Sequence, residues 1–351
     1  MSTPHVAIAI LNYNGKKHLE IYLPSVMAST YGNKSIWVID NGSNDGSLEY
    51  LASYYPQVQI VKNSGNIGFA AGYNAGLQNI PADYYVLLNS DVEVTPNFIE
   101  PMVALMENDV SIAFAQPKLR WLRNKEMFEY AGGAGGMIDT LGYPFCKGRI
   151  LEHLEKDLGQ YDGESAVFWA TGACMFARAS VYKLLGGMYE YYYMHNEEID
   201  LCWRAQNMGH KIVSTSASTV FHLGGGSLEW ENPKKTYYTF RNNMVMNIRN
   251  MPVARLLWLI PLRTALDAVA AVRFIVGKKT KMGWAVFKAM ADYWIWLVAA
   301  PAKKIYTTGV QKKWPGKRSF ANLKGVFKGS IVWNYFVRKK KTYQLLKDWK
   351  D

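Results

Sequence analysis

Residues 6–40 read VAIAILNYNGKKHLEIYLPSVMASTYGNKSIWVID and contain two short apolar runs on either side of a stretch of helical length. The runs, at 6–11 and 35–40, are rich in β-branched residues, and the helical stretch lies at 17–28. Strands that are apolar on both faces and are joined by a helix are typical of a parallel sheet covered by helices on both sides. This segment therefore predicts an α/β fold.

The alternation of apolar runs and helical stretches continues to residue 116. Further strands are predicted at 58–63, 84–89 and 111–116, and further helices at 69–79 and 96–107. Ligands of such sheets bind beyond the carboxyl ends of the strands. The polar residues that end these runs are therefore candidates for a site: Asn12, Asn14, Asp40, Asn63, Asn66, Asn89 and Asp91. The irregular stretch that follows, residues 117–165, is expected to form long loops over the sheet.

The length and the cysteine content suit a large globular protein of a reducing compartment. A chain of 351 residues can bury a sizeable core, and we expect one large domain with an appendage. Cys146, Cys174 and Cys202 form no CxxC pair, so they predict neither a disulfide framework nor a zinc site, and we expect them to be buried. The N-terminus lacks the basic stretch and long apolar run of a signal peptide, which favours a cytoplasmic protein.

The charge of the chain is concentrated at one end. Residues 255–351 carry 21 Lys and Arg and 4 Asp and Glu, a net charge of +17, whereas residues 1–254 carry the remaining 19 and 24, a net charge of −5. A segment this basic suits either nucleic acid or an anionic membrane as its partner.

Two aspartates at strand ends each allow two interpretations. Asp91 directly follows the apolar run at 84–89, where a carboxylate can hold a divalent metal that in turn holds a diphosphate, or can merely cap a helix or turn. Asp40 lies in VIDNGSNDGS, where it can accept a hydrogen bond from a base or ribose, or open an Asn-Gly turn. These residues alone leave both questions open.

Glycines and one histidine mark two other segments. Gly68, Gly72 and Gly76 recur every four residues, a spacing that favours close packing of one helix face over phosphate binding. The pattern is not GxGxxG, which argues against a nicotinamide cofactor. His222 ends the run STVFH before LGGGS, and it is either structural or able to approach phosphate oxygens with the flexible backbone that follows it.

Three acids open a predicted helix in YYYMHNEEIDLCWRAQNMG, residues 191–209. Glu197 and Asp200 are three residues apart and share a face, and Asp200 can pair with Arg204 four residues later. Glu198 points about 100° away from Glu197 at 3.6 residues per turn. It is therefore a candidate general base, because a tyrosine-rich apolar pocket would desolvate its carboxylate and raise its pKa.

Eight motifs in order resemble those of the family 2 inverting glycosyltransferases of GT-A fold, in particular the rhamnosyltransferase-like group of bacterial cell-surface polysaccharide enzymes. They span roughly residues 5–245 and read AILNYNG, VIDNGSNDGS, NIGFAAGYNAG, LLNSDVEV, TGACMFARASVYKLLGG, HNEEIDLCWRAQNMGHKI, VFHLGGGS and YYTFRNN. The resemblance implies a GT-A domain, a Rossmann-like mixed sheet flanked by helices, over residues 1–250.

The resemblance also implies roles for particular residues. Asn12 and Asp40 would surround the nucleotide base and ribose, and Asn66, Gly68 and Asn74 would line the donor pocket. Asp91 would hold Mg²⁺ or Mn²⁺ against the donor diphosphate, with His222 as a further ligand of the metal or the diphosphate. Glu197 and Glu198 would be the catalytic acids, the second acting as base. Arg241 and Asn242 would contact phosphate or acceptor.

The chain departs from the family pattern at two positions. The first acid of the D-x-D motif is Asn89, so metal binding would depend more on Asp91. The base position carries Glu198 where the family usually has Asp, which makes the side chain one methylene longer. The implied reaction is a single displacement at the anomeric carbon, and it needs a base for the acceptor hydroxyl and a cation for the leaving diphosphate.

The C-terminal segment has the length of a membrane span at 253–277, but Arg263 and Asp267 near its middle argue against one. At about 100° per residue, Arg255, Arg263, Asp267 and Arg273 fall within an arc of about 120°. This pattern predicts an amphipathic helix in a membrane interface, followed by Lys and Arg clusters that suit anionic lipid. The alternative is a helical subdomain packed on the catalytic domain. The many Leu, Val and Trp residues argue against nucleic acid.

These observations predict a cytoplasmic enzyme on the inner face of the bacterial cell membrane. It would transfer a sugar from a nucleotide-diphosphate donor to a glycan or lipid-linked acceptor, with residues 251–351 as a basic, membrane-associating helical region. Two rival classes are a catalytically inactive sugar-nucleotide-binding or scaffold homologue and a nicotinamide-dependent oxidoreductase.

Overall fold

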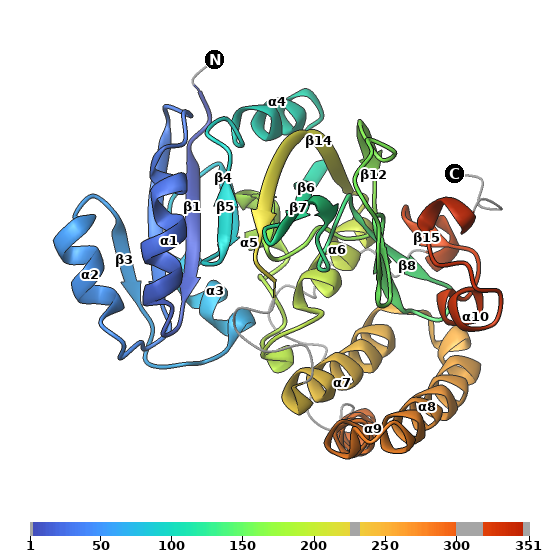
Figure 1. Cartoon of the computed structure of the whole chain (residues 1–351). Coiled ribbons are helices and arrows are strands. Elements are labelled where there is room, and N and C mark those ends of the chain that lie inside the picture. The colour runs from blue at the N-terminus through green and yellow to red at the C-terminus, as the bar shows by residue number, and fades with distance from the viewer. Residues whose placement is uncertain (1–2, 225–231, 300–318, 347–351) are drawn as a thin grey trace.

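The computed structural model describes residues 3–224, 232–299 and 319–346, and its centre is a ten-stranded sheet (Figure 1). The strand order is β12-β14-β6-β13-β4-β1-β2-β3, with β5 paired to β14 and β7 paired to β6. The strands are β1 Val6–Asn12, β2 Lys34–Asp40, β3 Gln59–Lys62, β4 Tyr84–Asn89, β5 Val92–Val94, β6 Ile112–Trp121, β7 Asn124–Phe128, β12 Glu164–Ala166, β13 Cys174–Arg178 and β14 Lys211–His222. The five strands predicted before residue 117 are thus confirmed.

The sheet is mixed because a strand from the second half of the chain enters its middle. Strands β3, β2, β1 and β4 are parallel neighbours. Strand β13 lies antiparallel between β4 and β6, and β14 then runs parallel to β6. The α/β fold and the mixed sheet are confirmed, but β6 is not a direct parallel neighbour of the first four strands.

Helices cover both faces of the sheet, as the doubly apolar strands predict. Val6, Ile8 and Ile10 of β1 belong to the core under α1, α2 and α4, whereas Ala7 and Ala9 belong to the core under α3, α5 and α6. Successive strand residues point to opposite faces, so a run without polar residues must be buried on both. These helices are α1 Lys16–Met27, α2 Ser47–Tyr54, α3 Phe69–Leu77, α4 Glu100–Asn108, α5 Ala179–Leu184 and α6 Glu197–Asn207.

The expectation of long loops at 117–165 is wrong. Strand β6 continues to Trp121, β7 and β12 join the main sheet, and the rest forms most of a second, five-stranded sheet in the order β11-β10-β9-β8-β15. Its strands are β8 Gly136–Asp139, β9 Pro144–Cys146, β10 Arg149–Ile150, β11 His153–Leu154 and β15 Val326–Phe327. Strands of two to four residues joined by glycine turns are too short to show a period of two in the sequence.

The C-terminal part packs on the catalytic part through helices and one strand. Helices α7 Pro233–Asn250, α8 Val253–Val276 and α9 Thr280–Ala299 form a layer at one end of the molecule, and α10 Ile331–Phe336 lies beside β15 (Figure 1). Short 3₁₀ helices in the described part of the chain lie at Glu190–Tyr192, Phe320–Asn322 and Tyr343–Leu346. Because β15 pairs with β8, the two predicted domains share a sheet, and their division after residue 250 stays a prediction.

Two smaller expectations can be compared with the structure. Cys146, Cys174 and Cys202 are buried, as expected. Within residues 3–224, 232–299 and 319–346, no helix is both long enough and apolar enough to cross a membrane.

Candidate active site

The first part of the candidate site lies where β1 and β2 end. The parallel register places Asn12 opposite Asp40, and Asn12 Nδ2 donates to Asp40 Oδ1 at 3.2 Å. The other carboxylate oxygen of Asp40 accepts the N–H groups of Gly42 and Ser43, at 3.2 and 3.0 Å, so Asp40 does hold the Asn-Gly turn. Asn12 Oδ1 is buried and has no hydrogen-bond partner among the described residues, which leaves an acceptor for a ligand N–H.

The glycine-rich segment that begins at Asn66 docks on the loop that precedes α6. Asn66 Oδ1 accepts hydrogen bonds from Gly68 N at 3.2 Å and Tyr193 Oη at 3.3 Å. Gly68 has φ +93°, and a Cβ there would lie 2.5 Å from the Tyr193 ring, so only glycine fits. The N–H of Phe69 at the start of α3 donates to Tyr193 O at 2.6 Å. The predicted donor-binding segment therefore supports the loop that precedes the predicted catalytic acids.

The two later glycines and Asn74 have structural roles in α3. A Cβ at Gly72 or Gly76 would approach Leu11 or Ile39 to 2.9 or 2.4 Å, so both glycines serve close packing, as their spacing suggests. Asn74, predicted to line the donor pocket, uses its amide on the loop after α5. It donates to Met188 O at 2.8 Å and accepts from Met188 N at 2.9 Å. Its contact with a donor stays a prediction.

Asp91 and His222 are brought together by the pairing of β5 with β14. Strand β5 starts just after Asp91, and its first residue, Val92, lies opposite His222, the last residue of β14. His222 Nε2 is 3.2 Å from Asp91 Oδ1, and both side chains are buried. These two predicted metal ligands, which are 131 residues apart in the sequence, are therefore direct neighbours.

Glu129, which the sequence analysis did not identify, lies on the other side of His222. It follows β7 and is 1% exposed, and its Oε1 lies 3.2 Å from His222 Nδ1. Burial alone would lower the pKa of His222, but Glu129 and Asp91 raise it to about 10. Burial alone would raise the pKa of Asp91, but the charge and hydrogen bond of His222 hold it below its ordinary value. No sequence motif marks Glu129, because it reaches His222 only through the pairing of β7 with β6 and of β6 with β14.

The residues around Asp91 could supply two of the ligands that a divalent metal needs. A carboxylate oxygen and an imidazole nitrogen are suitable ligands for a cation such as Mn²⁺, which on binding would displace the proton that the raised pKa keeps on His222. A second carboxylate on the far nitrogen is typical of metal-binding histidines. Asn89 ends β4 two residues before Asp91, and its N–H donates to Ala173 O at 3.0 Å. Among the described residues, no group of three or more His, Cys, Asp and Glu is arranged to hold a metal. The protein would thus supply Asp91 and His222, and a bound diphosphate further oxygens.

The acids at the start of α6 are distributed as their helical spacing predicts. Glu197 and Asp200 share the inner face and are 4% and 0% exposed, whereas Glu198 is half-buried. Burial raises the pKa of Glu198 to about 7, against the opposing effect of nearby main-chain N–H groups. Burial, together with the charge of Glu198, raises the pKa of Glu197 well above its ordinary value. Neither Glu197 Oε2 nor Glu198 Oε2 has a hydrogen-bond partner among the described residues.

Glu198 is linked through Gly172 and Ala173 to the strand end that carries the predicted metal ligand. A Cβ built on Gly172 would lie 3.9 Å from Glu198 Cβ and 3.3 Å from Phe69 Cζ. The next residue, Ala173, accepts the hydrogen bond from Asn89 N. The segment that precedes β13 therefore connects the predicted base to the strand end before Asp91. His195, also not identified from the sequence, adds a neutral ring, because burial and the charge of Lys235 lower its pKa to about 4.

The loop before α6 has an unusual backbone that α7 holds in place. Tyr193, His195 and Asn196 all have positive φ, between 64° and 72°, which non-glycine residues rarely adopt. Asn242 Nδ2 donates to the carbonyl oxygens of Tyr192, Met194 and His195 at 2.9, 2.7 and 2.8 Å. Such a backbone persists only where its surroundings hold it, so Asn242 positions the helix that begins with Glu197.

Arg241 is also occupied by this loop. Its Nη2 donates to Tyr191 O at 2.9 Å and Tyr192 O at 3.2 Å, and its Nε donates to Asn242 Oδ1 at 2.9 Å. The side chain is 8% exposed. The structure thus gives Arg241 a positioning role, and the contact with phosphate or acceptor that the motif suggests stays a prediction.

Asp200 connects α6 to the end of α7 through its buried carboxylate. Arg204 Nε donates to its Oδ2 at 2.7 Å, which confirms the expected pair, and Asn250 Nδ2 donates to its Oδ1 at 2.7 Å. Burial alone would raise the pKa of Asp200, but Arg249 and Arg204 hold it below its ordinary value. The carboxylate is therefore structural and is not available to an acceptor.

We expect Asn242→Ala to destabilise the protein. Met194 O and His195 O would lose this donor, and Arg241 Nε would lose its acceptor, whereas Tyr192 O would keep Arg241 Nη2. Unfolding by urea should show a free energy of unfolding lower by about 3 kcal/mol. The matched control is Asn108→Ala, at an exposed position at the end of α4. It should change this free energy by less than about 0.5 kcal/mol. Equal stability of the two variants would contradict the positioning role of Asn242.

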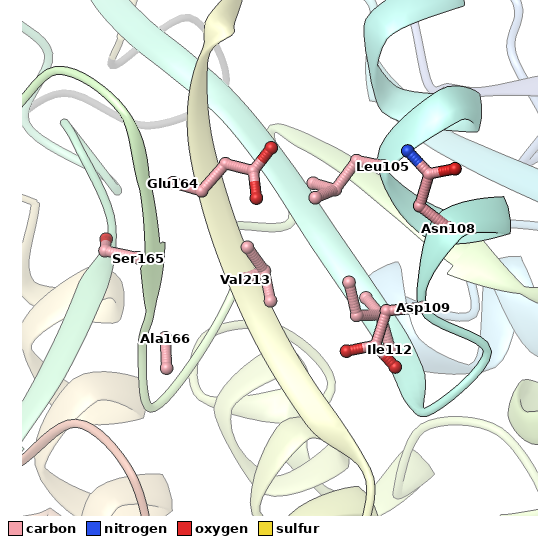
Figure 2. A pocket seen from close by; sticks show the side chains of 8 residues that line it. All are labelled: Leu105, Asn108, Asp109, Ile112, Glu164, Ser165, Ala166 and Val213. Atoms are coloured by element: carbon pink, nitrogen blue, oxygen red, sulfur yellow. The ribbon is translucent and has the colours of Figure 1, made fainter.

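A pocket of about 230 Å³ lies at the opposite end of the sheet and does not belong to this site (Figure 2). It is lined by Leu105, Asn108, Asp109, Ile112, Glu164, Ser165, Ala166 and Val213. Its acid Asp109 is bound to Lys211 Nζ at 2.7 Å and to Ser111 Oγ at 2.5 Å. Because it lies at the amino ends of β6 and β14, it is remote from the strand ends that carry Asp91 and His222.

The fold is similar to that of solved glycosyltransferases. A mannosyltransferase from Pyrobaculum calidifontis, solved in complex with GDP-Man and Mn²⁺, superposes with a TM-score of 0.53 at 14% identity, over 84% of this chain and 88% of that chain. A mixed sheet of this kind, with helices on both faces, is the GT-A fold.

The sequence comparisons define the family. The profile described as Glycosyl transferase family 2 matches residues 7–181, and through this domain the chain belongs to glycosyltransferase family 2. The N-acetylglucosaminyl-diphospho-decaprenol L-rhamnosyltransferase of Mycobacterium tuberculosis is 24% identical over 63% of this chain and 76% of its own length. The low-salt glycan biosynthesis hexosyltransferase Agl10 of Haloferax volcanii is 21% identical over 68% of this chain and 74% of its own length.

Proposed function

We propose that this glycosyltransferase inverts the configuration of the sugar that it transfers from a nucleotide-diphosphate donor to a glycan or lipid-linked acceptor. The observation that carries the proposal is Glu198, whose pKa is raised to about 7. It lies near Gly172, and the next residue, Ala173, is hydrogen-bonded to Asn89 at the strand end before Asp91. A carboxylate with a pKa near the working pH is suited to general base catalysis.

The chain's own residues supply the base and the donor contacts. Glu198 takes the proton of the acceptor hydroxyl as that oxygen attacks the anomeric carbon. The bond from this carbon to the diphosphate breaks on the opposite face, and its electron pair leaves with the nucleotide diphosphate. Asn12 Oδ1 accepts a hydrogen bond from the donor. Asp91 and His222 would hold a divalent metal, Mg²⁺ or Mn²⁺, which would stabilise charge on the leaving diphosphate.

The acceptor and the place of action follow from the relatives and the charge. The mycobacterial relative is named for a lipid-linked acceptor, N-acetylglucosaminyl-diphospho-decaprenol. This name supports the same class of acceptor here, in cell-surface polysaccharide synthesis. The basic region 251–351 suits anionic lipid. We therefore place the enzyme in the cytoplasm, on the inner face of the bacterial cell membrane.

Nucleotide binding tests the proposed donor class directly. We expect UDP, dTDP or GDP to raise the melting temperature of the protein more with Mn²⁺ than without it, because a ligand at 100 times its Kd stabilises the folded state by about 2.7 kcal/mol. NAD should not shift the melting temperature. Stabilisation by NAD alone would instead support an oxidoreductase, and nucleotide binding without any transfer or donor hydrolysis would support the inactive homologue.

A further inference from the structure

The exposed side of α8 is almost entirely apolar. Its exposed residues are Val253, Ala254, Leu257, Trp258, Pro261, Leu262, Ala265, Val269, Val272, Arg273 and Val276. Only Arg273 among them is charged, and Leu257, Val269 and Val276 are 75%, 65% and 77% exposed. A helix on the surface of a soluble protein normally presents charged and polar side chains to water.

The charged side of α8 is turned inward, against the catalytic part. Arg263 Nη1 donates to Leu141 O at 2.7 Å, and Arg263 Nη2 donates to Asn243 Oδ1 at 2.6 Å. Asp267 lies 3.8 Å from Arg263 and is 0% exposed. Arg263 and Asp267 of the charged arc that the sequence predicts therefore do not face the polar side of a membrane interface, whereas Arg273 is exposed. The buried pair binds α8 to the protein, as the alternative of a packed subdomain requires, and the described residues leave the apolar side uncovered.

Neighbouring helices extend this uncovered surface. Helix α9 contacts α8 through the Thr264–Tyr293 hydroxyl pair at 2.9 Å and exposes Trp294, Ile295 and Val298 in its second half. Helix α10 lies against the end of α8, where the Arg273 guanidinium is 4.4 Å from the Phe336 ring. Trp333, Phe336 and Val337 are exposed there. We call these exposed residues of α8, α9 and α10 the apolar face.

Lysines and arginines border the apolar face. The turn between α8 and α9 exposes Lys278 and Lys279, and the start of α9 exposes Lys281. The segment after α10 exposes Arg338, Lys339 and Lys341. A second copy of this chain docked face to face would bring two regions of net charge +17 together. Anionic lipid headgroups would neutralise the same charges, and tryptophan side chains such as Trp258 are favoured at the lipid–water interface.

We infer that the apolar face is the surface that lies in the interfacial layer of an anionic lipid membrane, with the bordering lysines and arginines on the headgroups. The inference deepens the proposed function, on which it rests for the presence of a membrane at the site of action. It does not depend on transfer of a sugar. Because Arg263 and Asp267 already bind α8 to the protein, membrane binding requires no rearrangement of α8.

Vesicle binding of the full chain tests this inference. We expect the wild type to co-sediment with vesicles of phosphatidylcholine and phosphatidylglycerol, and less with phosphatidylcholine alone or at high salt. The triple variant Leu257→Glu/Leu262→Glu/Val269→Glu should bind about tenfold more weakly or worse, since three charges would enter the apolar layer. These positions are exposed, so the melting temperature should remain close to that of the wild type.

The matched control places three glutamates on exposed apolar positions elsewhere, Ile21→Glu/Val110→Glu/Leu158→Glu. It should bind vesicles as the wild type does, after allowance for the same loss of net charge. Equal binding by the two triple variants, or no vesicle binding by the wild type, would overturn the inference. So would a wild-type dimer in light scattering that only the α8 variant dissociates. Vesicle binding by a protein without transferase activity would contradict the proposed function but still support this inference.

Discussion

Glu198→Gln should lower kcat by about 10²- to 10⁴-fold while nucleotide binding persists. The amide keeps the shape and the hydrogen-bonding capacity of the side chain but cannot accept the hydroxyl proton at neutral pH. The protein should not lose stability, because Glu198 Oε2 makes no hydrogen bond that the amide would break among the described residues. The measurements are kcat with donor and acceptor, and the Kd of the nucleotide by calorimetry.

The pH profile of the wild type gives an independent measure of the same residue. Burial raises the pKa of Glu198 to about 7, so the carboxylate form prevails only above that pH. Activity should therefore rise with pH and level off above pH about 7, with a slope of about tenfold per pH unit on the acid side. Glu197 and Glu198 interact, and the apparent pKa belongs to the pair. In Glu198→Gln this acid limb should disappear from the residual activity.

The control repeats the substitution at an equivalent helix position. Glu49 lies in the first turn of α2, as Glu198 does in α6, but it is exposed, and α2 contains none of the candidate site residues. Glu49→Gln should leave kcat unchanged. If Glu198→Gln kept wild-type kcat, or if Glu197→Gln alone abolished activity and the acid limb, Glu197 rather than Glu198 would be the base.

The spacing of residues was sufficient to predict which side chains share a face, but not always which face is buried. In α6 the buried Arg204 and Asp200 pair as the spacing predicts, and Glu198 points away from them. In α8 the same reasoning groups Arg263 and Asp267 correctly. It also predicts that these charged residues face water, because charged side chains are usually exposed. Here hydrogen bonds to Leu141 O and Asn243 turn them inward, and those partners come from distant segments.

Residues that meet through strand pairing were predictable only where the strands themselves were. Asn12 and Asp40 end two strong apolar runs, so their proximity follows from a parallel register. Glu129 follows a short strand in a stretch expected to be loop, and no local pattern connects it to His222. The loop before α6 is similar, since its positive φ angles depend on Asn242, a residue of α7.

Asp91→Asn should abolish the effect of Mn²⁺ on nucleotide binding and lower transfer by about 10²-fold or more. The neutral amide is a poorer ligand, and only His222 would then remain of the two neighbouring groups. The change should also free His222 from one of the two carboxylates that raise its pKa. The direct measurement is the nucleotide-induced shift in melting temperature with and without Mn²⁺, which requires no transfer activity.

Asp83 provides the matched control, because it precedes β4 at the amino end just as Asp91 follows β4 at the carboxyl end. It is exposed, and among the described residues its side chain accepts a hydrogen bond from the N–H of His5 at 2.7 Å. Asp83→Asn should keep the Mn²⁺ effect. The Mn²⁺ effect in Glu129→Gln should lie between those of Asp91→Asn and Asp83→Asn. Metal affinity should be about 10- to 100-fold weaker than in the wild type, because the amide still orients the His222 imidazole but lacks the charge. If Asp91→Asn and Asp83→Asn responded equally to Mn²⁺, the leaving diphosphate would have to be stabilised without Asp91.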